Sequence, residues 1–597
     1  MRIRKEKYLS RVIRTFNNRE RREELLLRLT DLPFLLSSLA MLLVLYEFGF
    51  DHSERIAEFL RLFYTTTLIA GIISIPARYI KAGKLPALKI IITECAILAI
   101  LILYVLIRLD VVSIILPAGS FLIYPMLFLV FIRELSVRQG TKRVRNINPA
   151  QLFIASFLLM ILTGSLILIL PNATRDGISY IDSLFTAASA VCVTGLIVVD
   201  TGSHFTLFGQ VIILILIQLG GLGIMTFTSY FSYFFQGGSS YQNQLMLKDL
   251  TNAGKMAGVF STLKKVIIVT FIIEAFGAVL IFIRIDPTLI PLTYERLFFA
   301  LFHSVSAFCN AGFSTLPDSL WTEGFKYAYR MHMIFAVLFI TGGLGFPILF
   351  NFLRYLRHLL VNLIFRRKKK HVPWVINVNT RIVFFTTLIL LAGGTLLFLM
   401  LEYQNTLADH NTTGKLAAAF FSAATPRTAG FNVIDTSSLT MPAILLTIML
   451  MWIGASPGST GGGIKTSTIA TAFLTIVSVA RGRDKTELAY RNISERSVRR
   501  AFSIIVLSLM AIAVSVFLIS LTEKDIALHK IVFESVSAFC TTGLSLGITA
   551  ALGSTAKMVL IITMFTGRVG MITILSAVMK KIENKAYRYI DEDILIN

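Results

Sequence analysis

Long hydrophobic runs alternate with short polar segments along the whole chain. A run of about 20 apolar residues has the length that crosses the hydrocarbon core of a bilayer as a helix. Four such runs come first, at 31–50, 62–80, 88–107 and 111–132. Four groups follow, in which long runs stand at 150–170 and 207–234, 264–285 and 330–352, 380–402 and 441–480, and 501–521 and 556–580. The pattern predicts an all-α polytopic membrane protein with about twelve full spans.

Each of the four groups also holds a shorter apolar segment, and one short stretch recurs directly after it. It reads SAVCVTG, SAFCNAG, ATPRTAG and SAFCTTG, and ends at Gly195, Gly312, Gly430 and Gly543. The glycines are separated by 117, 118 and 113 residues, and near-equal copies of one unit predict quasi-equivalent walls around an axis. We expect a four-helix extension at 1–148 and a pore domain at 149–597, with repeats at about 149–240, 260–355, 378–482 and 498–582.

The recurring stretch has the composition of an ion filter. A closing glycine lets the backbone turn where a Cβ would clash. Irregular backbone is tolerated at membrane depth only where it is buried or lines a watery cavity, and rings of carbonyl groups there replace an ion's hydration shell. The alternative is that small residues only permit close helix packing. The candidate filter residues are Val193, Thr194, Gly195, Asn310, Ala311, Gly312, Thr428, Ala429, Gly430, Thr541, Thr542 and Gly543.

The helix that precedes each stretch would point its partly negative C-terminus toward the axis, which favours a cation. No ring of acidic side chains accompanies the four stretches, so selection is expected to rest on carbonyl groups, which suits potassium.

Composition and charge agree with a membrane protein. The 597 residues are 55% hydrophobic, only 15% are charged, and the mean hydropathy is +0.74. The net charge of +23 does not indicate nucleic acid, because Lys and Arg gather in short loops between the runs. Positive loops face the cytoplasm. An even number of spans then places both termini in the cytoplasm.

With these motifs the sequence resembles the Trk/Ktr/HKT superfamily of potassium transport proteins, closest to the bacterial TrkH and KtrB subunits, over roughly residues 150–597. The resemblance implies potassium uptake across a bacterial plasma membrane, with Gly195 favouring potassium over sodium. It also implies a homodimer and a cytosolic nucleotide-binding regulatory subunit of TrkA or KtrA type. No nucleotide-binding unit or other cofactor site is visible in this chain. The third stretch departs from the others, because Arg427 stands where they have cysteine.

Three cysteines occupy equivalent positions in the other stretches, at Cys192, Cys309 and Cys540. Three thiols around an axis suggest a metal site. The simpler interpretation is that each is a small packed side chain, since free cysteine behaves as a small hydrophobe. Arg427 at the fourth position argues against a bound cation there.

A glycine-rich segment, WIGASPGSTGGGIKTSTIA, interrupts the run at 441–480. It is not a phosphate-binding loop, because the GxxxxGK[ST] spacing fails and no strand precedes it. An unwound segment at this depth must border a cavity. The resemblance implies a loop that obstructs the pore below the filter. We expect 454–463 to be this gate, with candidate residues Gly458, Gly461, Gly462, Gly463 and Lys465, whose charge would repel a cation.

Arg568 lies about twelve residues into the last run, roughly 18 Å along a helix. A charge at this depth is costly and usually functional, although a structural ion pair is the alternative. The resemblance places it opposite the gate, where loop carbonyls or hydroxyls would accept its hydrogen bonds. Glu534 is expected to accept hydrogen bonds from filter backbone amides, whereas Glu94 and Glu274 are left as unassigned packing partners.

Two other functions remain open. A sodium-coupled potassium symporter on the same scaffold is one, and the sequence does not separate it from a gated channel. An intramembrane enzyme is the other, but no Ser/His/Asp set or HExxH motif is present and His303 stands alone. We therefore expect a transporter and not an enzyme.

Overall fold

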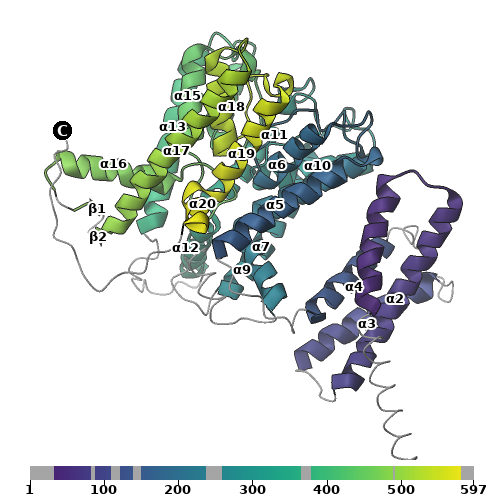
Figure 1. The fold of residues 1–597 in the computed structure, drawn as a ribbon. Coiled ribbons are helices and arrows are strands. Elements are labelled where there is room, and N and C mark those ends of the chain that lie inside the picture. Colours follow the sequence, from purple (N-terminus) through teal and green to yellow (C-terminus); the bar gives the residue numbers. More distant parts are fainter. Residues whose placement is uncertain are drawn as a thin grey trace, which may run out of the picture. The chain divides into compact units, whose positions relative to one another are not determined.

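A computed structural model describes residues 32–82, 88–108, 122–138, 149–236, 259–364, 378–483, 485–488 and 491–579. This part of the chain is almost entirely helical (Figure 1). It divides into two compact units, each with its own apolar core. The first unit comprises Met1–Arg145, Leu170–Ala173 and Tyr230–Asn243, and the second comprises Asn146–Ile169, Thr174–Ser229 and Gln244–Asn597.

The first unit contains a helix at Leu32–Gly49 and the helices α2 (Glu54–Ala82), α3 (Leu88–Arg108) and α4 (Ile123–Arg138). Apolar side chains such as Leu60, Leu68, Leu101 and Leu127 form its core. The predicted run at 62–80 is part of a helix that begins eight residues earlier. The predicted run at 111–132 lies partly outside the described residues, and its described part belongs to α4, which continues to Arg138.

Buried charges inside the first unit are paired. The Arg133 guanidinium donates to Glu134 Oε1 at 2.7 Å, to Ser74 Oγ at 2.8 Å and to Glu94 Oε2 at 3.4 Å. Arg133 and Glu134 are 8% and 0% exposed, so this ion pair is shielded from solvent. Glu94, which the sequence left unassigned, therefore has Arg133 as a polar partner.

The second unit repeats one order of helices four times. A long helix is followed by a short one, and then by a helix that is continuous, bent or interrupted. The elements are α5 (Pro149–Leu168), α6 (Tyr180–Cys192), α7 (Leu207–Gln236), α9 (Val259–Arg284), α10 (Thr293–Phe308), α11 (Tyr329–Leu344), α12 (Phe346–Ile364), α13 (Val378–Glu402), α14 (Thr412–Ala424), α15 (Met441–Trp452), α16 (Thr466–Ala480), α17 (Glu495–Thr522), α18 (Leu528–Cys540), α19 (Ser554–Val569) and α20 (Met571–Val578). The short strands β1 (Glu487–Leu488) and β2 (Arg491–Asn492) pair antiparallel between α16 and α17.

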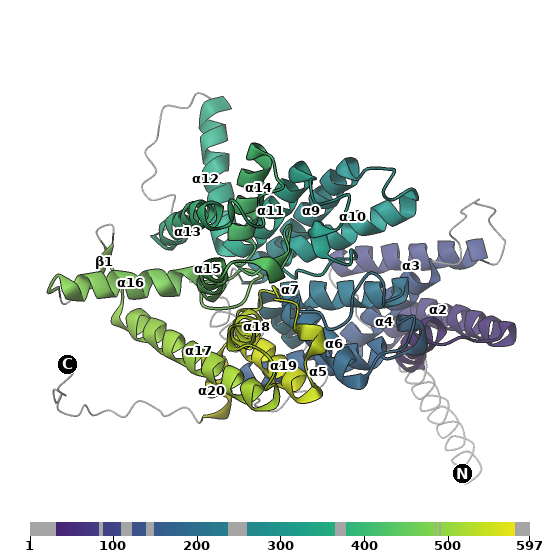
Figure 2. The ribbon, with the colours of Figure 1, turned by 90° about the horizontal axis from the view of Figure 1, so that it is seen from above.

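The four short helices α6, α10, α14 and α18 surround a common centre when the second unit is viewed from above (Figure 2). Each packs on the long helix before it: α6 on α5, α10 on α9, α14 on α13 and α18 on α17. Helices from neighbouring groups also meet, since α14 packs on α11, α18 on α15 and α6 on α19. The last contact joins the end of the chain to its first short helix, and Lys557 Nζ lies 2.7 Å from Asp182 Oδ1 there.

Six helices of the described residues are long and apolar enough to cross a membrane, or eight if two bent pairs each count as one span. The chain is thus a multi-pass membrane protein. The sequence predicted about twelve spans. Four runs account for the difference. The runs that contain α3 and α7 qualify only over shorter apolar windows, α4 in the run at 111–132 has only 16 described residues, and the run at 441–480 is divided into α15 and α16.

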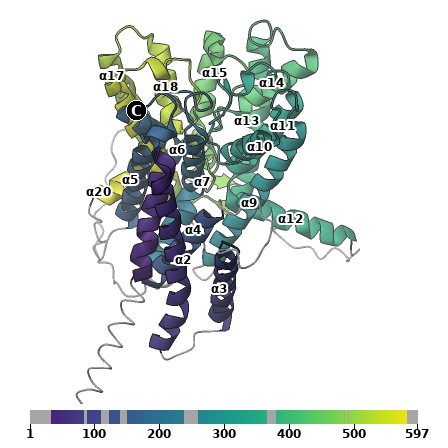
Figure 3. The ribbon, with the colours of Figure 1, turned by 90° about the vertical axis from the view of Figure 1, so that its right-hand side faces the viewer.

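Two predicted runs are not continuous helices, which corrects the sequence analysis. The run at 330–352 bends by 105° between α11 and α12, and the run at 556–580 bends by 90° between α19 and α20. The bends lie at Gly345 and Gly570, whose φ angles are +84° and +85°. A residue with a side chain rarely adopts this conformation, so glycine permits both breaks. Beyond its bend, α12 projects sideways from the second unit (Figure 3).

Candidate functional site

Each of the four short helices ends within the first four residues of its recurring stretch. Ser179 and Asn411 cap the N-termini of α6 and α14, because their side chains accept hydrogen bonds from the amides of Asp182 and Gly414. The opposite ends lead directly into the recurring stretches, so the C-terminal dipole ends of all four helices adjoin them.

The backbone follows the same unusual path in all four stretches. The residue two before each glycine has a positive φ angle, and so has the glycine itself. The angles are 56° and 89° for Val193 and Gly195, 61° and 71° for Asn310 and Gly312, 77° and 77° for Thr428 and Gly430, and 51° and 89° for Thr541 and Gly543. Residues other than glycine adopt positive φ at a cost of roughly 1–3 kcal/mol. The surrounding helices therefore hold three side-chain-bearing types, valine, asparagine and threonine, in one strained conformation.

The four glycines form a closed ring, and each lies against a backbone carbonyl of the next stretch. A Cβ atom added to Gly195 would lie 2.4 Å from the carbonyl oxygen of Ala311, and one added to Gly312 would lie 2.9 Å from that of Ala429. A Cβ atom added to Gly430 would lie 2.4 Å from the carbonyl oxygen of Thr542, and one added to Gly543 would lie 2.2 Å from that of Thr194. No side chain fits at any of the four positions. The carbonyl groups of Thr194, Ala311, Ala429 and Thr542 are thereby brought to one ring, which we call the glycine ring.

Hydroxyl groups at the ends of the short helices form hydrogen bonds with the backbone at or next to the ring glycines. In the first and fourth stretches, the amides of Gly195 and Gly543 donate to Ser189 Oγ and Ser537 Oγ, both at 3.1 Å. In the second and third stretches the hydroxyl is the donor: Ser306 Oγ donates to the Phe313 carbonyl at 2.7 Å and Thr425 Oγ1 to the Phe431 carbonyl at 2.6 Å.

Glu534 has a different role from the one predicted. Its carboxylate accepts from the hydroxyl groups of Ser545 and Thr549 and from the amide of Leu546. These partners follow the glycine ring in the sequence, whereas the Gly543 amide is bonded by Ser537. The prediction that Glu534 binds filter amides is therefore wrong, because a serine hydroxyl already occupies that position.

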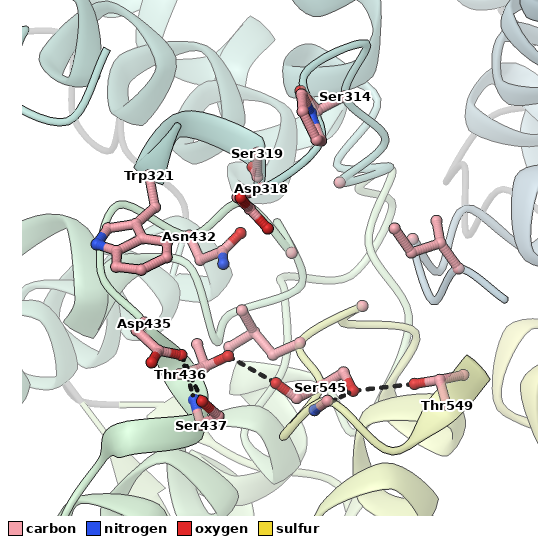
Figure 4. A pocket seen from close by; sticks show the side chains of 18 of the residues that line it. Ser314, Asp318, Ser319, Trp321, Asn432, Asp435, Thr436, Ser437, Ser545 and Thr549 are labelled. Carbon is pink, nitrogen blue, oxygen red and sulfur yellow. Dashed lines mark hydrogen bonds between the residues drawn. The ribbon is translucent and has the colours of Figure 1, made fainter. Parts of the chain in front are cut away.

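A cavity of about 330 Å³ opens on one side of the glycine ring (Figure 4). All four ring glycines line it, and we call it the vestibule. Its other walls include Ser314, Asp318, Trp321, Asn432, Asp435, Ser545 and Thr549. Burial opposes ionisation of the Asp435 carboxyl, but hydrogen bonds from the hydroxyl and amide of Ser437 outweigh it and lower its pKa. Asp435 therefore carries a negative charge at neutral pH, which attracts cations to the vestibule.

The segment between α15 and α16, residues 453–465, lies against the recurring stretches at the residues that precede the ring glycines. We call it the glycine-rich loop. A Cβ atom added to Gly461 would lie 2.1 Å from Thr428 Oγ1, and one added to Gly462 would lie 2.1 Å from Thr541 Oγ1. The Thr460 hydroxyl lies 3.3 Å from the side chain of Asn310. The loop thus touches the residue two before the ring glycine in three of the four stretches.

The bend at Gly345 holds the loop from another side. The Phe346 amide donates to the Gly458 carbonyl at 3.0 Å, and the Ser456 amide donates to the Gly343 carbonyl at 3.0 Å. Gly458 and Gly463 have φ angles of 72° and 65°, so glycine is required for the shape of the loop as well as for its close approach.

The charged group of Lys465 is hydrogen-bonded to the glycine-rich loop. Its ammonium group donates to the carbonyls of Gly461 at 2.6 Å and Gly462 at 3.2 Å. Both acceptors belong to the part of the loop beneath the ring. The Lys465 charge is therefore held by carbonyl groups of the glycine-rich loop itself.

Arg568 joins three elements at the loop. It is 4% exposed in α19, and its guanidinium donates to the Thr460 carbonyl of the loop and, at 2.5 Å, to the Gly220 carbonyl of α7. A Cβ atom added to Gly220 would lie 2.1 Å from the Val191 carbonyl, so α7 passes close to the end of α6 here. The Thr460 carbonyl is one of the loop acceptors expected for Arg568, whereas the sequence analysis did not include Gly220 of α7.

The three cysteines are buried but have separate surroundings. Cys309 Sγ lies 3.6 Å from Glu274 Oε1, and the other oxygen of Glu274 accepts from Gln218 Nε2 at 3.2 Å. Glu274 thus has polar partners beyond the packing predicted for it. Among the described residues, no three His, Cys, Asp or Glu side chains are grouped so as to hold a metal ion. Arg427 is 8% exposed and donates to Thr387 Oγ1 at 3.3 Å.

Comparisons with known proteins agree with one another. The TrkH family, described as cation transport protein, matches residues 125–589. The Ktr system potassium uptake protein B of Vibrio alginolyticus is 37% identical over 461 residues, which are 77% of this chain and 97% of that protein. The protein of the same name from Bacillus subtilis is 36% identical over 452 residues, covering 75% and 96%.

Two further similarities bear on function and fold. The potassium/sodium uptake protein NtpJ of Enterococcus hirae is 36% identical over 465 residues, covering 76% of this chain and 99% of that protein. The crystal structure of the potassium transporter TrkH from Vibrio parahaemolyticus superposes with a TM-score of 0.60 at 17% identity, over 82% of this chain and 96% of that one. At this identity the likeness shows the fold alone. The family match begins at residue 125, so most of the first unit lies outside it.

Proposed function

Because this chain belongs to the TrkH cation transport protein family, and is thus a transporter rather than an enzyme, we propose that it takes up potassium through the glycine ring. The observation that carries the proposal is the closed set of contacts between each ring glycine and the next stretch. Four backbone segments without intervening side chains present carbonyl oxygens to one axis, as carbonyl filters for potassium do. The potassium uptake named for the Vibrio and Bacillus relatives supports this assignment.

The proposed filter comprises residues 193–195, 310–312, 428–430 and 541–543, each held by a short helix. The C-terminal ends of these helices carry partial negative charge and stabilise a dehydrated cation. Ser189, Ser306, Thr425 and Ser537 hold the stretches in place, so the ring need not collapse around a smaller ion. The domain assignment that follows is a pore domain of four repeats at 149–597 and an extension at 1–148.

The glycine-rich loop is the proposed gate. It lies against Asn310, Thr428 and Thr541 on the side of the ring opposite the vestibule, and Arg568 and Lys465 bond to its carbonyls. In this proposal the loop obstructs ion passage until it moves. Its glycines, Gly458, Gly461, Gly462 and Gly463, leave it few side chains that would anchor it to the surrounding helices.

We expect purified protein in liposomes to accumulate potassium, and rubidium as its analogue, in preference to sodium. The measurement is isotope flux with and without a sodium gradient at fixed membrane potential. Uncoupled permeation requires that the initial rate of potassium flux stay unchanged when the sodium gradient is removed. A rate that falls with the sodium gradient would establish the alternative, a sodium-coupled symporter. The name of the Enterococcus relative mentions sodium as well as potassium. Equal sodium and potassium fluxes would contradict the filter assignment.

Shortening the loop should open the pore. Deletion of residues 459–462 removes the part that contacts Thr428 and Thr541, so basal potassium flux should rise severalfold without any partner protein. A matched control is deletion of residues 286–289 from the exposed turn after α9, whose hydrogen bonds are local. If the folded loop variant, compared at equal amounts by size-exclusion chromatography, conducts as the unaltered protein does, the loop is not the gate.

The setting of the pore follows from the family and the charge pattern. The protein is proposed to work as a homodimer in the bacterial inner membrane with both termini in the cytoplasm. A cytosolic nucleotide-binding subunit of TrkA or KtrA type would dock on basic inner segments, such as the one at 354–370, whose residues 365–370 lie outside the described part of the chain. Nucleotide would then bind to the partner and not to this chain.

A further inference from the structure

Two buried side chains of the short helices share one position relative to the glycine ring. His303 in α10 and Glu534 in α18 each lie nine residues before a ring glycine. Each bonds to a serine two residues after that glycine: the His303 Nε2 atom lies 2.9 Å from Ser314 Oγ, and Glu534 Oε1 accepts from Ser545 Oγ. The two groups belong to alternate stretches, the second and the fourth. Ser314 and Ser545 both line the vestibule directly outside the ring.

The hydrogen bonds of His303 define its tautomer. Its Nδ1 atom lies 2.9 Å from the Phe299 carbonyl, which only accepts, so Nδ1 carries a proton. The ring is 0% exposed and lies 4.0 Å from the Phe299 ring, centroid to centroid. No carboxylate of the described residues forms an ion pair with it, and a buried unpaired cation is strongly disfavoured. The imidazole is therefore neutral, Nε2 is an acceptor, and the Ser314 hydroxyl donates its proton to it.

Glu534 imposes the same direction on Ser545. It is 1% exposed and receives hydrogen bonds from the Ser545 hydroxyl, the Thr549 hydroxyl at 3.1 Å and the Leu546 amide. Three donors converge on a group that acts as acceptor. The Ser545 proton thus points away from the vestibule.

The two serines present oxygen and not hydrogen to the vestibule. Each also accepts one backbone amide, Ser314 from Leu316 at 3.0 Å and Ser545 from Gly547 at 2.9 Å. One lone pair of Ser314 remains, and one of Ser545 remains when Thr549 gives its single proton to Glu534. Without a buried acceptor, a serine hydroxyl rotates freely and can turn its proton toward the cation.

We propose that His303 and Glu534 are positioning residues that orient the Ser314 and Ser545 hydroxyls as an outer potassium site at the mouth of the ring. This rests on the proposed potassium uptake through that ring. Asn432, at the equivalent position of the third stretch, also lines the vestibule and supplies a further oxygen. Ile197, at that position of the first stretch, supplies none.

The test is the external potassium concentration that gives half-maximal uptake, the KM, in liposomes or potassium-depleted cells. Ser314→Ala and Ser545→Ala should each raise the KM about three- to tenfold, because one hydrogen-bond-sized contribution is worth about 0.5–1.5 kcal/mol and 1.4 kcal/mol is tenfold. His303→Leu should raise the KM equally. In the Ser314→Ala background it should raise the KM no further, because the hydroxyl through which His303 acts is then absent.

Two variants separate positioning from structural support. His303→Gln retains an acceptor that reaches toward Ser314 and should restore most of the lost affinity. His332→Leu removes an equally buried histidine, whose Nε2 bonds to the Phe325 carbonyl, and should leave the KM unchanged.

Three results would overturn the inference: an unchanged KM in both serine variants, an additive effect of His303→Leu in the Ser314→Ala background, or a KM raised equally by His332→Leu. Uptake by the unaltered protein separates failure of the outer site from failure of the proposed potassium uptake. Absence of potassium uptake by the unaltered protein would remove the proposed function itself. Normal uptake with unchanged KM in the serine variants would remove only the outer site.

Discussion

Gly195→Ser should abolish most of the discrimination between potassium and sodium. A Cβ atom at this position would lie 2.4 Å from the Ala311 carbonyl oxygen, and the glycine has a φ angle of 89°. The serine can be accommodated only if the ring stretches move apart or turn a carbonyl away. Three carbonyl groups of the ring then keep their places, and the Ala311 carbonyl is displaced. We expect the permeability ratio of potassium to sodium to fall by about tenfold or more, which corresponds to 1.4 kcal/mol of lost selectivity.

Gly177→Ser is the matched control for this substitution. Gly177 has a similar φ angle of 77°, but an added Cβ would meet no atom within 4 Å. It therefore carries the backbone cost of a positive φ without a contact in the ring. The ratio is read from potassium and sodium fluxes in reconstituted vesicles. An unchanged ratio in Gly195→Ser, or an equal fall in Gly177→Ser, would show that the ring does not select the ion.

Arg568→Ala should raise basal potassium flux in the absence of any partner. The side chain donates charge-assisted hydrogen bonds to the loop at Thr460 and to α7 at Gly220, and such bonds contribute about 1.5–3 kcal/mol each. If they stabilise the closed loop, the loss of one of them shifts the ratio of open to closed states at least tenfold. Flux through the purified protein should rise accordingly.

Arg568→Lys tests the geometry of this contact. Lysine keeps the charge but lacks the planar fork that reaches two carbonyls at once, so it should restore closure only in part. The three proteins are compared at equal amounts of folded material. Equal basal flux in all three would mean that Arg568 is a structural charge rather than a latch.

Sequence reasoning located the ring because the signal for it is repeated four times. Gly195, Gly312, Gly430 and Gly543 stand out by spacing alone, and the structure brings all four to one cavity. Arg568 was found because a charge inside an apolar run is rare. Both signals are local and need no knowledge of which segments meet.

Features that depend on contacts between distant segments were missed. Gly345 and Gly570 lie in apolar runs whose composition is that of a continuous helix. The bend at Gly345 is stabilised by the bond from the Phe346 amide to the Gly458 carbonyl, which the sequence does not reveal. The role of Glu534 was misassigned because the competing Ser537 bond is visible only in three dimensions. A comparison of the positions nine before and two after each glycine would have paired His303 with Ser314.

The packing of α6 against α19 has a consequence for biosynthesis. The bond between Asp182 and Lys557 joins residues 375 positions apart, and the contact of Gly543 with Thr194 closes the ring between the same first and fourth groups. Three quarters of the ring can assemble while the ribosome is still translating, but the last wall exists only once α18 and α19 have been inserted. Long-range closure of this kind comes late in folding. A truncated or stalled chain therefore lacks the contact of Gly543 with Thr194 and leaves one side of the ring without its neighbouring stretch.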